Sequence, residues 1–365
     1  MGSAQEKSPE KSQEKSQEKS AAKPPERIPE KTPEKYSEKL KLELTDDLSG
    51  LPVSAPVFGL RAWLEATRKA LPFPVKVLKV FKGETFVAYL PLQFIVRGGL
   101  TKAFVPILTF YGGPCFVADR RKYFNEDVKE RYEILGAILD WLEGRWEYCL
   151  LLPEDADVRP ALERGWICKP RYTVVNLLSA PNSLEFNRAC SKSIRKAESL
   201  GLTFGETQGD GAFEEAFTRT FVRKGLSMKW KPRWAADLRR ELTGSGLLEH
   251  LAVRTAEGKE IAFASVALDR HRKSAILWYS CSLKEADNTG AMHFLIRSLL
   301  ERYRGGSYGN AFETFDLCGA DHRSLSEFKE KFANRLEARF SLEKYRGPVS
   351  RALLKGFETA RSWLG

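Results

Sequence analysis

Phe-Asp-Leu-Cys-Gly-Ala occupies residues 315–320, and Leu-Ser-Glu-Phe-Lys-Glu-Lys-Phe occupies residues 325–332. The first segment has the pattern of a short buried strand that ends in a turn, and the second has apolar residues at the spacing of one helix face. Upstream, Ser-Ile-Arg-Lys-Ala-Glu-Ser-Leu-Gly-Leu at residues 193–202 predicts a basic helix that ends at Gly201. The interpretation of the second half of the chain rests on these three segments.

The strand–turn–helix segment carries two polar residues whose positions suggest chemistry. Asp316 stands at the end of an apolar strand, where a carboxylate is costly to bury unless it is hydrogen-bonded or functional. Two roles fit it: accepting a proton from an attacking amine, or holding a loop amide at Gly319. Lys329 follows the apolar Phe328, so we expect it to be exposed in a cleft, as a functional group or as an ordinary solvated lysine.

Outward from these segments, apolar periodicity predicts two mixed units with a similar order of elements. In the second unit we expect helices at 184–200, 211–224, 232–243, 290–303 and 324–332, and strands at 202–206, 248–255, 261–268, 274–280, 314–317 and 337–342. In the first unit we expect helices at 56–71, 126–144 and 159–164, and strands at 75–81, 85–94, 104–108, 115–117, 146–152 and 172–178.

The expected fold class is α/β (α+β), with two tandem domains that each have a mixed, mostly antiparallel sheet and flanking helices. Residues 1–47 repeat short Pro-Glu-Lys and Gln-Glu-Lys units and predict a disordered low-complexity tail. The first domain is expected to span residues 48–181 and the second residues 182–347, starting after a helix cap at residues 181–183. Residues 348–365 have near-helical apolar spacing and predict an amphipathic C-terminal helix.

In their order and spacing, the quoted segments resemble the FemAB-like branch of the GNAT acyltransferase superfamily, which includes the Fem peptidyltransferases and BioF2-like acyltransferases. Residues 105–106 and 111–114 are similar to the first domain of that branch. The resemblance covers about residues 51–345 and implies tandem GNAT-like domains that transfer an acyl group to an amino group. It departs from the GNAT pattern at residues 284–291, where Lys-Glu-Ala-Asp-Asn-Thr-Gly-Ala replaces the usual loop for the phosphates of acetyl-CoA.

The resemblance also implies roles for individual residues. Lys329 would neutralise the negative charge that develops during acyl transfer. Tyr279, in a predicted strand, would orient the substrate or protonate a leaving group, and a half-buried core tyrosine is the alternative reading. Tyr111, Gly112 and Gly319 are expected to line a substrate cleft between the two domains.

Positive charge is concentrated on two predicted helical regions. Arg188, Lys192 and Arg195 have i, i+4, i+7 spacing and share one helix face. Residues 219–240 contain eight Lys and Arg against Asp237 alone, a composition that suits phosphates and, with two tryptophans, stacked bases. A solvated helix surface is the alternative reading for both regions.

From these regions and the start of the helix at 290 we predict donor-binding residues. Besides the helix face they are Arg223, Lys224, Lys229, Lys231, Arg233, Thr289 and Gly290. The last two could begin a helix whose free N–H groups face an anion, although Glu285 and Asp287 oppose this.

Composition excludes several classes of protein. The 365 residues carry a formal net charge of +11, mostly after residue 181, which favours an anionic partner. No apolar run is long enough to span a bilayer, and the N-terminus has no signal-peptide pattern. The six cysteines and four histidines lack ligand spacing, so we expect no metal. We expect a cytoplasmic protein, in which residues 348–365 either pack on the second domain or contact the inner face of an acidic membrane.

The sequence therefore predicts an N-acyltransferase that moves an acyl or aminoacyl group to a small-molecule or lipid-linked amine. The resemblance alone places this reaction in cell-envelope or surface-glycan biosynthesis. The expected donor is an acyl-CoA such as acetyl-CoA, or an aminoacyl-tRNA, and in the latter case the protein would be an aminoacyl-tRNA-dependent peptidyltransferase. An alternative of another class is a non-catalytic module that binds nucleic acid or a protein partner on a GNAT fold.

Overall fold

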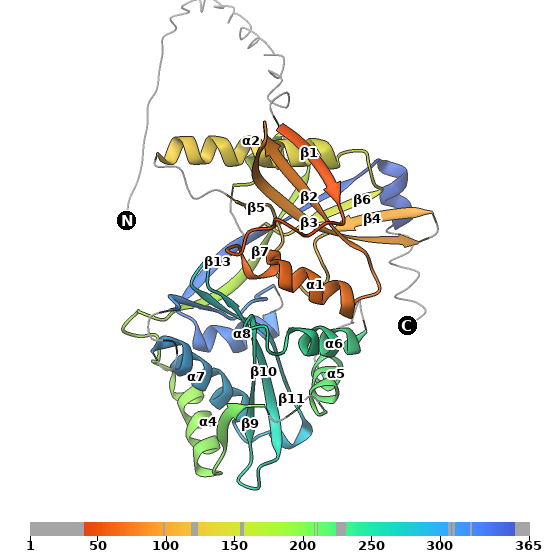
Figure 1. Cartoon of the computed structure of the whole chain (residues 1–365). Coiled ribbons are helices and arrows are strands. Elements are labelled where there is room, and N and C mark those ends of the chain that lie inside the picture. The colour runs from red at the N-terminus through yellow and green to blue at the C-terminus, as the bar shows by residue number, and fades with distance from the viewer. Residues whose placement is uncertain are drawn as a thin grey trace, which may run out of the picture. The chain divides into compact units, whose positions relative to one another are not determined.

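A computed structural model describes residues 40–354, except for residues 98, 118–122, 154–156, 208, 210, 224–230, 306–307, 309–310 and 322. Figure 1 shows its helices and strands along the chain. Residues 37–365 form one unit, which contains every described element. We call residues 40–181 the first half of this unit and residues 182–354 the second half.

The described part of the first half contains seven strands, three α-helices and a 3-10 turn. They are β1 (Leu40–Thr45), η2 (Val57–Gly59), α1 (Arg61–Ala70), β2 (Val75–Lys82), β3 (Thr85–Arg97), β4 (Leu100–Phe104), β5 (Cys115–Phe116), α2 (Phe124–Leu142), β6 (Tyr148–Leu151), α3 (Arg159–Glu163) and β7 (Ile167–Leu177). The first turn of the long helix α2 contains acidic residues, whose negative charge interacts favourably with the helix dipole. One face of this helix is buried and carries Leu135, Ile138, Leu139 and Leu142.

The second half begins with helix α4, and a helical stretch at residues 348–354 follows its last strand. Its elements are α4 (Arg188–Ser199), β8 (Thr203–Glu206), α5 (Phe213–Arg223), α6 (Pro232–Leu242), β9 (Leu248–Arg254), β10 (Glu260–Asp269), β11 (Ser274–Ser282), η3 (Lys284–Ala286), α7 (Ala291–Arg304), β12 (Thr314–Asp316), α8 (Arg323–Lys329), η4 (Glu330–Phe332) and β13 (Arg335–Tyr345). Helices α4 and α7 pack together on one face of strands β9 to β11, and α5 and α6 lie on the other face (Figure 1).

All described strands belong to one sheet, in the order β1-β2-β3-β4-β6-β13-β7-β12-β11-β10-β9-β8, with β5 beside β3. Two neighbouring pairs are parallel, β4 with β6 in the first half and β11 with β12 in the second, and the other pairs are antiparallel. The predicted mixed, mostly antiparallel arrangement of each half is therefore confirmed. Strand β13, at the end of the second half, lies between β6 and β7, and β7 pairs with β12. The predicted boundary at residue 181 therefore does not separate two sheets.

The two halves also share a hydrophobic core. One cluster of buried side chains combines Val57, Phe58, Trp63, Leu71, Phe213, Phe217, Leu238, Leu242, Phe263 and Trp278, and in it α1 packs against α6. The Trp278 indole nitrogen of β11 donates to the Leu108 carbonyl of the first half at 2.6 Å. Because burying apolar surface is the main favourable term in folding, we expect the halves to unfold together.

Strand β1 corrects the predicted limit of the N-terminal tail. Residues 40–45 were expected to belong to the tail, but they pair with β2, and Leu40, Leu42 and Leu44 pack against the core of the first half. The alternation of these leucines with Lys and Glu is the period of a strand, which the charge-rich repeats before it obscure. Residues 1–39 lie outside the described residues.

Two other expectations differ from the structure. Asn187, rather than residues 181–183, caps α4, because its side-chain oxygen accepts from the backbone N–H of Cys190 at 2.9 Å. The strand expected at 104–108 ends at Phe104, since Pro106 has no N–H to donate and Leu108 has a positive φ of 69°.

The C-terminal helix is only partly described. Residues 348–354 are helical, and residues 355–365 lie outside the described residues. Of the predicted apolar face, Val349 is 72% exposed and Leu353 47% exposed, whereas Leu354 is buried. Contact of this helix with an acidic membrane stays a prediction.

The role of β1 can be tested by truncation. Deletion of residues 1–36 should leave the melting temperature within about a degree of the full chain, because their composition cannot build a core. Deletion of residues 1–46 should lower it by several degrees, since an edge strand and its leucines are lost. Differential scanning calorimetry of both variants distinguishes these outcomes, and equal melting temperatures would contradict the structural role of β1.

A buried cation contacts a histidine in the second half. Arg239 of α6 is 1% exposed, and its Nε donates to Nδ1 of His250 on β9 at 3.0 Å. The His250 ring also lies within hydrogen-bond distance of the hydroxyls of Ser265 and Thr243. Burial and the neighbouring Arg239 charge lower the pKa of His250 to about 3, against the opposing effect of Glu249. The imidazole is therefore neutral in the folded protein.

This contact predicts acid sensitivity. The unfolded chain takes up a proton at His250 below about pH 6.5, whereas the folded protein does so only near pH 3, so folding stability falls as the pH falls through this window. The His250→Gln variant should lack this part of the pH dependence. In urea unfolding at several pH values, the free energy of unfolding of the wild type should therefore fall more steeply towards pH 4 than that of the variant. The variant should then become as stable as the wild type, or more stable. A constant difference between the two proteins would contradict the assignment.

Candidate active site at the junction of the two halves

A loop of the first half, residues 105–114, connects β4 to β5 and reaches the junction with the second half. Gly112 exchanges two backbone hydrogen bonds with Leu152, of 2.7 and 2.8 Å. A Cβ on Gly112 would come within 2.5 Å of Val105, so the close approach of the loop to itself requires glycine here. These contacts fix the position of the neighbouring Tyr111, which is buried.

Asp316, at the end of β12, accepts hydrogen bonds from three separate parts of the chain. Its carboxylate is 3% exposed. It accepts from the Tyr111 hydroxyl, from the Thr173 hydroxyl at 2.5 Å and from the Cys318 backbone N–H at 2.7 Å. Three donors compensate the cost of burying the charge. Of the two predicted roles, the structure forms the bond to a loop amide, although the amide belongs to Cys318 and not to Gly319.

Lys329 lies beneath the turn that follows β12. Cys318 and Gly319 both have a φ of 53°, so the chain turns back sharply over the end of α8. The Lys329 ammonium donates to the Cys318 carbonyl at 2.5 Å. Burial lowers the pKa of Lys329, and the Cys318 thiol and the carboxylates of Asp316 and Asp321 oppose this shift.

We expected Lys329 to be exposed in a cleft. Its ammonium group is instead covered by the turn, so this expectation is wrong for the charged end of the side chain. The position after a core phenylalanine does point away from that core. However, the turn at residues 318–319 covers the side chain, and a sequence pattern on one helix does not report such a long-range contact.

Tyr279 of β11 belongs to an aromatic cluster. Its ring centroid lies 5.6 Å from that of Phe110, 4.9 Å from Phe217 and 4.6 Å from Trp278. Burial and the nearby Cys318 thiol raise the pKa of Tyr279. The structure thus brings together the three predicted catalytic residues, Lys329, Asp316 and Tyr279, around Cys318. The sequence analysis missed Thr173 and Cys318, because a threonine in a strand and an isolated cysteine carry no distinguishing pattern.

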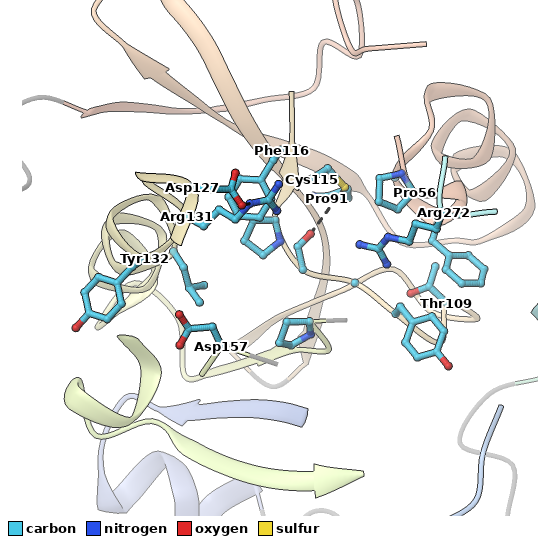
Figure 2. A pocket seen from close by; sticks show the side chains of 18 of the residues that line it. Pro56, Pro91, Thr109, Cys115, Phe116, Asp127, Arg131, Tyr132, Asp157 and Arg272 are labelled. Atoms are coloured by element: carbon cyan, nitrogen blue, oxygen red, sulfur yellow. Dashed lines mark hydrogen bonds and ion pairs between the residues drawn. The ribbon is translucent and has the colours of Figure 1, made fainter. Parts of the chain in front are cut away.

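A cavity of about 530 Å³ opens beside the Tyr111 loop (Figure 2). This volume is within the range of small-molecule sites. Tyr111 and Gly112 line it, whereas Gly319 lines a separate hollow of about 20 Å³ to which Tyr111 also contributes, and the assignment of these three residues to a substrate cleft stays a prediction. Much of the wall is apolar, from Pro56, Phe58, Pro91, Pro106, Pro114, Phe116, Phe124 and Pro153.

The cavity wall also carries charged residues that the sequence analysis did not select. Asp127 and Arg131 of α2 form an ion pair at 3.0 Å, and the Arg131 guanidinium lies over the Phe116 ring, 4.2 Å from its centroid. Asp157 and Arg159 pair at 2.7 Å. The i, i+4 spacing on α2 was the only local signal for these pairs, and such pairs are common on helix surfaces.

The predicted phosphate-binding face of α4 is exposed. Cys190, Ile194 and Ala197 are buried on the opposite face of the helix. In the described part of the chain, the exposed Arg188, Lys192 and Arg195 form no ion pair. The structure therefore leaves this basic face available to an anionic partner, and the binding itself stays a prediction.

The basic run at 219–240 is partly neutralised. Arg219 and Arg223 both pair with Asp287, and Arg233 lies 4.0 Å from Asp237. Lys231 is exposed. Lys224 and Lys229 lie outside the described residues.

At the start of α7, where we predicted an anion site, α4 packs against Gly290. The Thr289 hydroxyl donates to the Ala286 carbonyl at 2.8 Å and accepts from the Ala291 N–H at 3.1 Å, so it caps its own turn. A Cβ on Gly290 would lie 2.0 Å from the Ser193 carbonyl oxygen of α4. Because the α4 backbone lies against Gly290, only glycine fits at this position, and the binding of an anion at Thr289 and Gly290 stays a prediction.

Two further properties concern the described residues as a whole. Within them, no group of three or more His, Cys, Asp or Glu side chains is arranged to hold a metal ion. No helix in the same ranges is both long and apolar enough to cross a membrane.

The contact of the half-buried Lys329 with the Cys318 carbonyl makes a stability prediction. The Lys329→Met variant keeps most of the side-chain volume but leaves the Cys318 carbonyl and the Asp316 carboxylate without their cation. We expect a loss of about 1–3 kcal/mol in the free energy of unfolding, because a buried acceptor loses its donor. Lys331→Met, which replaces a half-buried lysine of η4 whose ammonium lies 5.9 Å from the centroid of the Phe328 ring, is the control and should change stability much less. Chemical denaturation that shows equal effects of the two substitutions would contradict the contact.

Comparison with known proteins gives structural matches only. No protein-family description matches the chain, and no curated protein matches its sequence. Among solved structures, FemX is similar with a TM-score of 0.57 and 16% identity, over 80% of this chain and 93% of FemX.

Two other solved structures match less well. A tandem GNAT protein from the clavulanic acid biosynthesis pathway has a TM-score of 0.47 and 11% identity, over 84% of this chain and 99% of that one. A protein described as the C-terminal domain of a lysylphosphatidylglycerol synthetase from Agrobacterium fabrum has a TM-score of 0.46 and 16% identity, over 74% and 85%. The match to FemX extends over nearly all of that protein and includes both halves of this chain, so the protein has the fold of FemX.

Proposed function

We propose that this protein transfers an acyl or aminoacyl group to the amino group of an acceptor, in cell-envelope or surface-glycan biosynthesis. The observation that carries the proposal is the cavity beside Tyr111, whose hydroxyl joins the buried Asp316 and Lys329 cluster, in a chain with the fold of FemX. The place in envelope biosynthesis rests on the resemblance to the Fem peptidyltransferases.

The reaction needs few protein groups. The acceptor amine attacks the carbonyl carbon of an ester or thioester, a C–N bond forms, the C–O or C–S bond breaks, and the amine proton leaves with the departing group. The enzyme must align the two substrates and stabilise the negative oxygen of the tetrahedral intermediate. We assign this stabilisation to the turn at residues 318–319, where Lys329 polarises the Cys318–Gly319 peptide from its carbonyl side.

In this assignment Asp316 and Tyr111 are positioning residues. The carboxylate already accepts three hydrogen bonds, so it is better placed to hold the turn and the Tyr111 loop in register than to take up a proton. Tyr279 closes the other side of Cys318 and limits the access of water.

Two observations favour an aminoacyl-tRNA as the donor over an acyl-CoA. The start of α7, where GNAT enzymes hold the phosphates of acetyl-CoA, is covered by α4 at Gly290. The outer face of α4 exposes Arg188, Lys192 and Arg195, and among the described residues these three side chains form no ion pair. An RNA backbone supplies the repeated phosphates that such a face binds.

The proposal is tested by a transfer assay with the full chain. Radiolabelled aminoacyl-tRNA and acetyl-CoA are each offered with a set of amine acceptors that includes lipid-linked and soluble envelope precursors. We expect labelled product from aminoacyl-tRNA. The double variant Arg188→Glu, Lys192→Glu should raise KM for tRNA at least tenfold with little change in kcat, since phosphate contacts hold ground state and transition state alike.

Lys129→Glu reverses one charge at an exposed site on α2 and should leave KM for tRNA unchanged, whereas Arg188→Glu alone, which makes the same charge change, should raise it. Turnover with acetyl-CoA alone, unaffected by the α4 substitutions, would overturn the choice of donor. RNA binding that falls steeply with salt, with no turnover of either donor, would support the non-catalytic binding module instead.

A further inference from the structure

Strand β1 forms one edge of the sheet that the two halves share. Among the described strands its one neighbour is β2 (Figure 1). In an antiparallel pair, alternate residues direct their backbone N–H and C=O groups to the neighbouring strand, and the residues between them direct theirs away from it. No loop within the described ranges bonds to the backbone of residues 40–45 on that outer side. The edge therefore presents backbone donors and acceptors to which another strand can bind.

The side chains of β1 separate into an apolar face and a charged face. Three leucines pack against the core that α2 covers, and each is only half-buried there: Leu40, Leu42 and Leu44. Lys41 and Glu43 lie on the opposite face and are exposed, and within the described part of the chain neither of them forms an ion pair. The edge therefore leaves leucine surface to be buried and two charges of opposite sign to be paired.

The lysine that stands across from Glu43 on β2 is bonded elsewhere. Lys79 is directly opposite Glu43 in the register of the two strands. Its ammonium bonds instead to the Asp47 carboxylate at 3.5 Å and to the Ser49 carbonyl at 3.0 Å, both in the segment that follows β1. A partner for Glu43 must therefore come from the outer side of the edge.

The order of charges along β1 fits the same strand of a second copy. When two identical strands pair antiparallel with Leu42 opposite Leu42, residue 41 of each copy stands opposite residue 43 of the other copy. Each Lys41 then faces a Glu43, and opposite charges in directly opposed positions attract. On the other face Leu42 meets Leu42 and Leu40 meets Leu44, so the row of leucines continues from one core to the next.

Shifted registers lose this match. With Glu43 opposite Glu43, or with Lys41 opposite Lys41, like charges stand directly opposite each other, which is destabilising. A shift by a single residue places leucines opposite charged side chains. The register centred on Leu42 is therefore the one in which charge and apolar surface both match.

Two other segments of the chain fit this edge less well. Residues 1–39 are rich in Glu, Lys and Pro, which are residue types depleted in strands. Strand β8, at the other edge of the sheet, has only four residues and contains Gly205. Pairing of β1 with β8 of the next copy would also be head-to-tail and would continue into a filament, whereas pairing of β1 with β1 closes at two copies.

We infer that two copies of this protein associate through β1 into a two-fold symmetric dimer, in which the two sheets join edge to edge with Leu42 opposite Leu42. The contact is isologous, because the same surface of each copy forms it. A pair of six-residue strands is smaller than a standard interface, so the dimer should be in reversible equilibrium with the monomer. The inference goes beyond the proposed transfer reaction and does not depend on it.

Sedimentation velocity of the full chain at several concentrations measures this association. We expect the average sedimentation coefficient to rise from that of a monomer to that of a dimer over about 1–100 µM protein, with no larger species. Because salt screens exposed charge pairs, an increase from about 0.05 to 0.5 M salt should weaken the dimer several-fold.

An exchange of charges at two residues tests the register. Lys41→Glu and Glu43→Lys each replace two attractive pairs by two repulsive ones, because the two-fold axis repeats the contact, and each should raise the dissociation constant about tenfold. The double variant Lys41→Glu, Glu43→Lys restores the attraction with the charges exchanged, so its dissociation constant should lie within about twofold of the wild type. Lys284→Glu makes the same charge change as Lys41→Glu at an exposed site on η3 and should dimerise like the wild type.

Cross-linking of the unmodified protein provides a measurement that does not depend on the folding of any variant. A carbodiimide joins a lysine to a carboxylate directly, so it reports only groups that are in contact. In a mixture of normal and heavy-isotope protein, the link between Lys41 and Glu43 should join normal to heavy peptides, and mass spectrometry identifies such mixed pairs. The same mixed link should be absent from the Glu43→Lys variant, which has lost the carboxylate.

Several results would overturn the inference. A chain that stays monomeric over the whole concentration range has no such contact, and species that grow beyond a dimer indicate head-to-tail pairing. A dimer that the double variant does not restore relative to the single variants forms through another surface. Links between Lys41 and Glu43 that occur only within one copy exclude the proposed register.

Discussion

The buried carboxylate of Asp316 is the interaction on which the candidate site depends. It accepts hydrogen bonds from Tyr111 in the first half, from Thr173 on the strand that joins the halves, and from the Cys318 amide of its own turn. A buried charge of this kind is stable only when all three donor groups lie within hydrogen-bond distance at the same time. The carboxylate therefore couples the Tyr111 loop, which lines the cavity, to the turn over Lys329, and it makes the site a property of both halves.

The shared sheet explains how these segments meet. Strand β13 returns from the second half to lie between β6 and β7, so neither half can complete its sheet alone. The core around Trp63 and Trp278 and the Asp269 carboxylate add further bonds across the same junction. In consequence, a residue of the second half, Arg272, lines the cavity beside the Tyr111 loop of the first half. Substrates bound there would contact groups that are about 160 residues apart in the sequence.

Three features of helix α4 depend on its position in the fold. Its buried face packs on the second core, its backbone at Ser193 presses against Gly290 at the start of α7, and its outer face carries Arg188, Lys192 and Arg195. The second contact fixes α4 against the start of α7, and the third leaves a row of positive charges exposed on the opposite side of the helix.

Local pattern determined much of the architecture, because apolar period and turn residues act over a few positions. The helices, most strands and the end of α4 before Gly201 follow from it, and so does the face shared by Arg188, Lys192 and Arg195. The expected FemAB-like fold came instead from the resemblance of the segments at residues 193–202, 315–320 and 325–332. Strand β1 was not predicted, because its alternating leucines directly follow charge-rich repeats. Contacts between distant segments were decided only in three dimensions: the covering of Lys329 by the turn at Cys318, the filling of the Gly290 position by α4, and the placing of Arg272 in the cavity. Such contacts depend on how strands far apart in the chain pair, and no local spacing encodes that pairing.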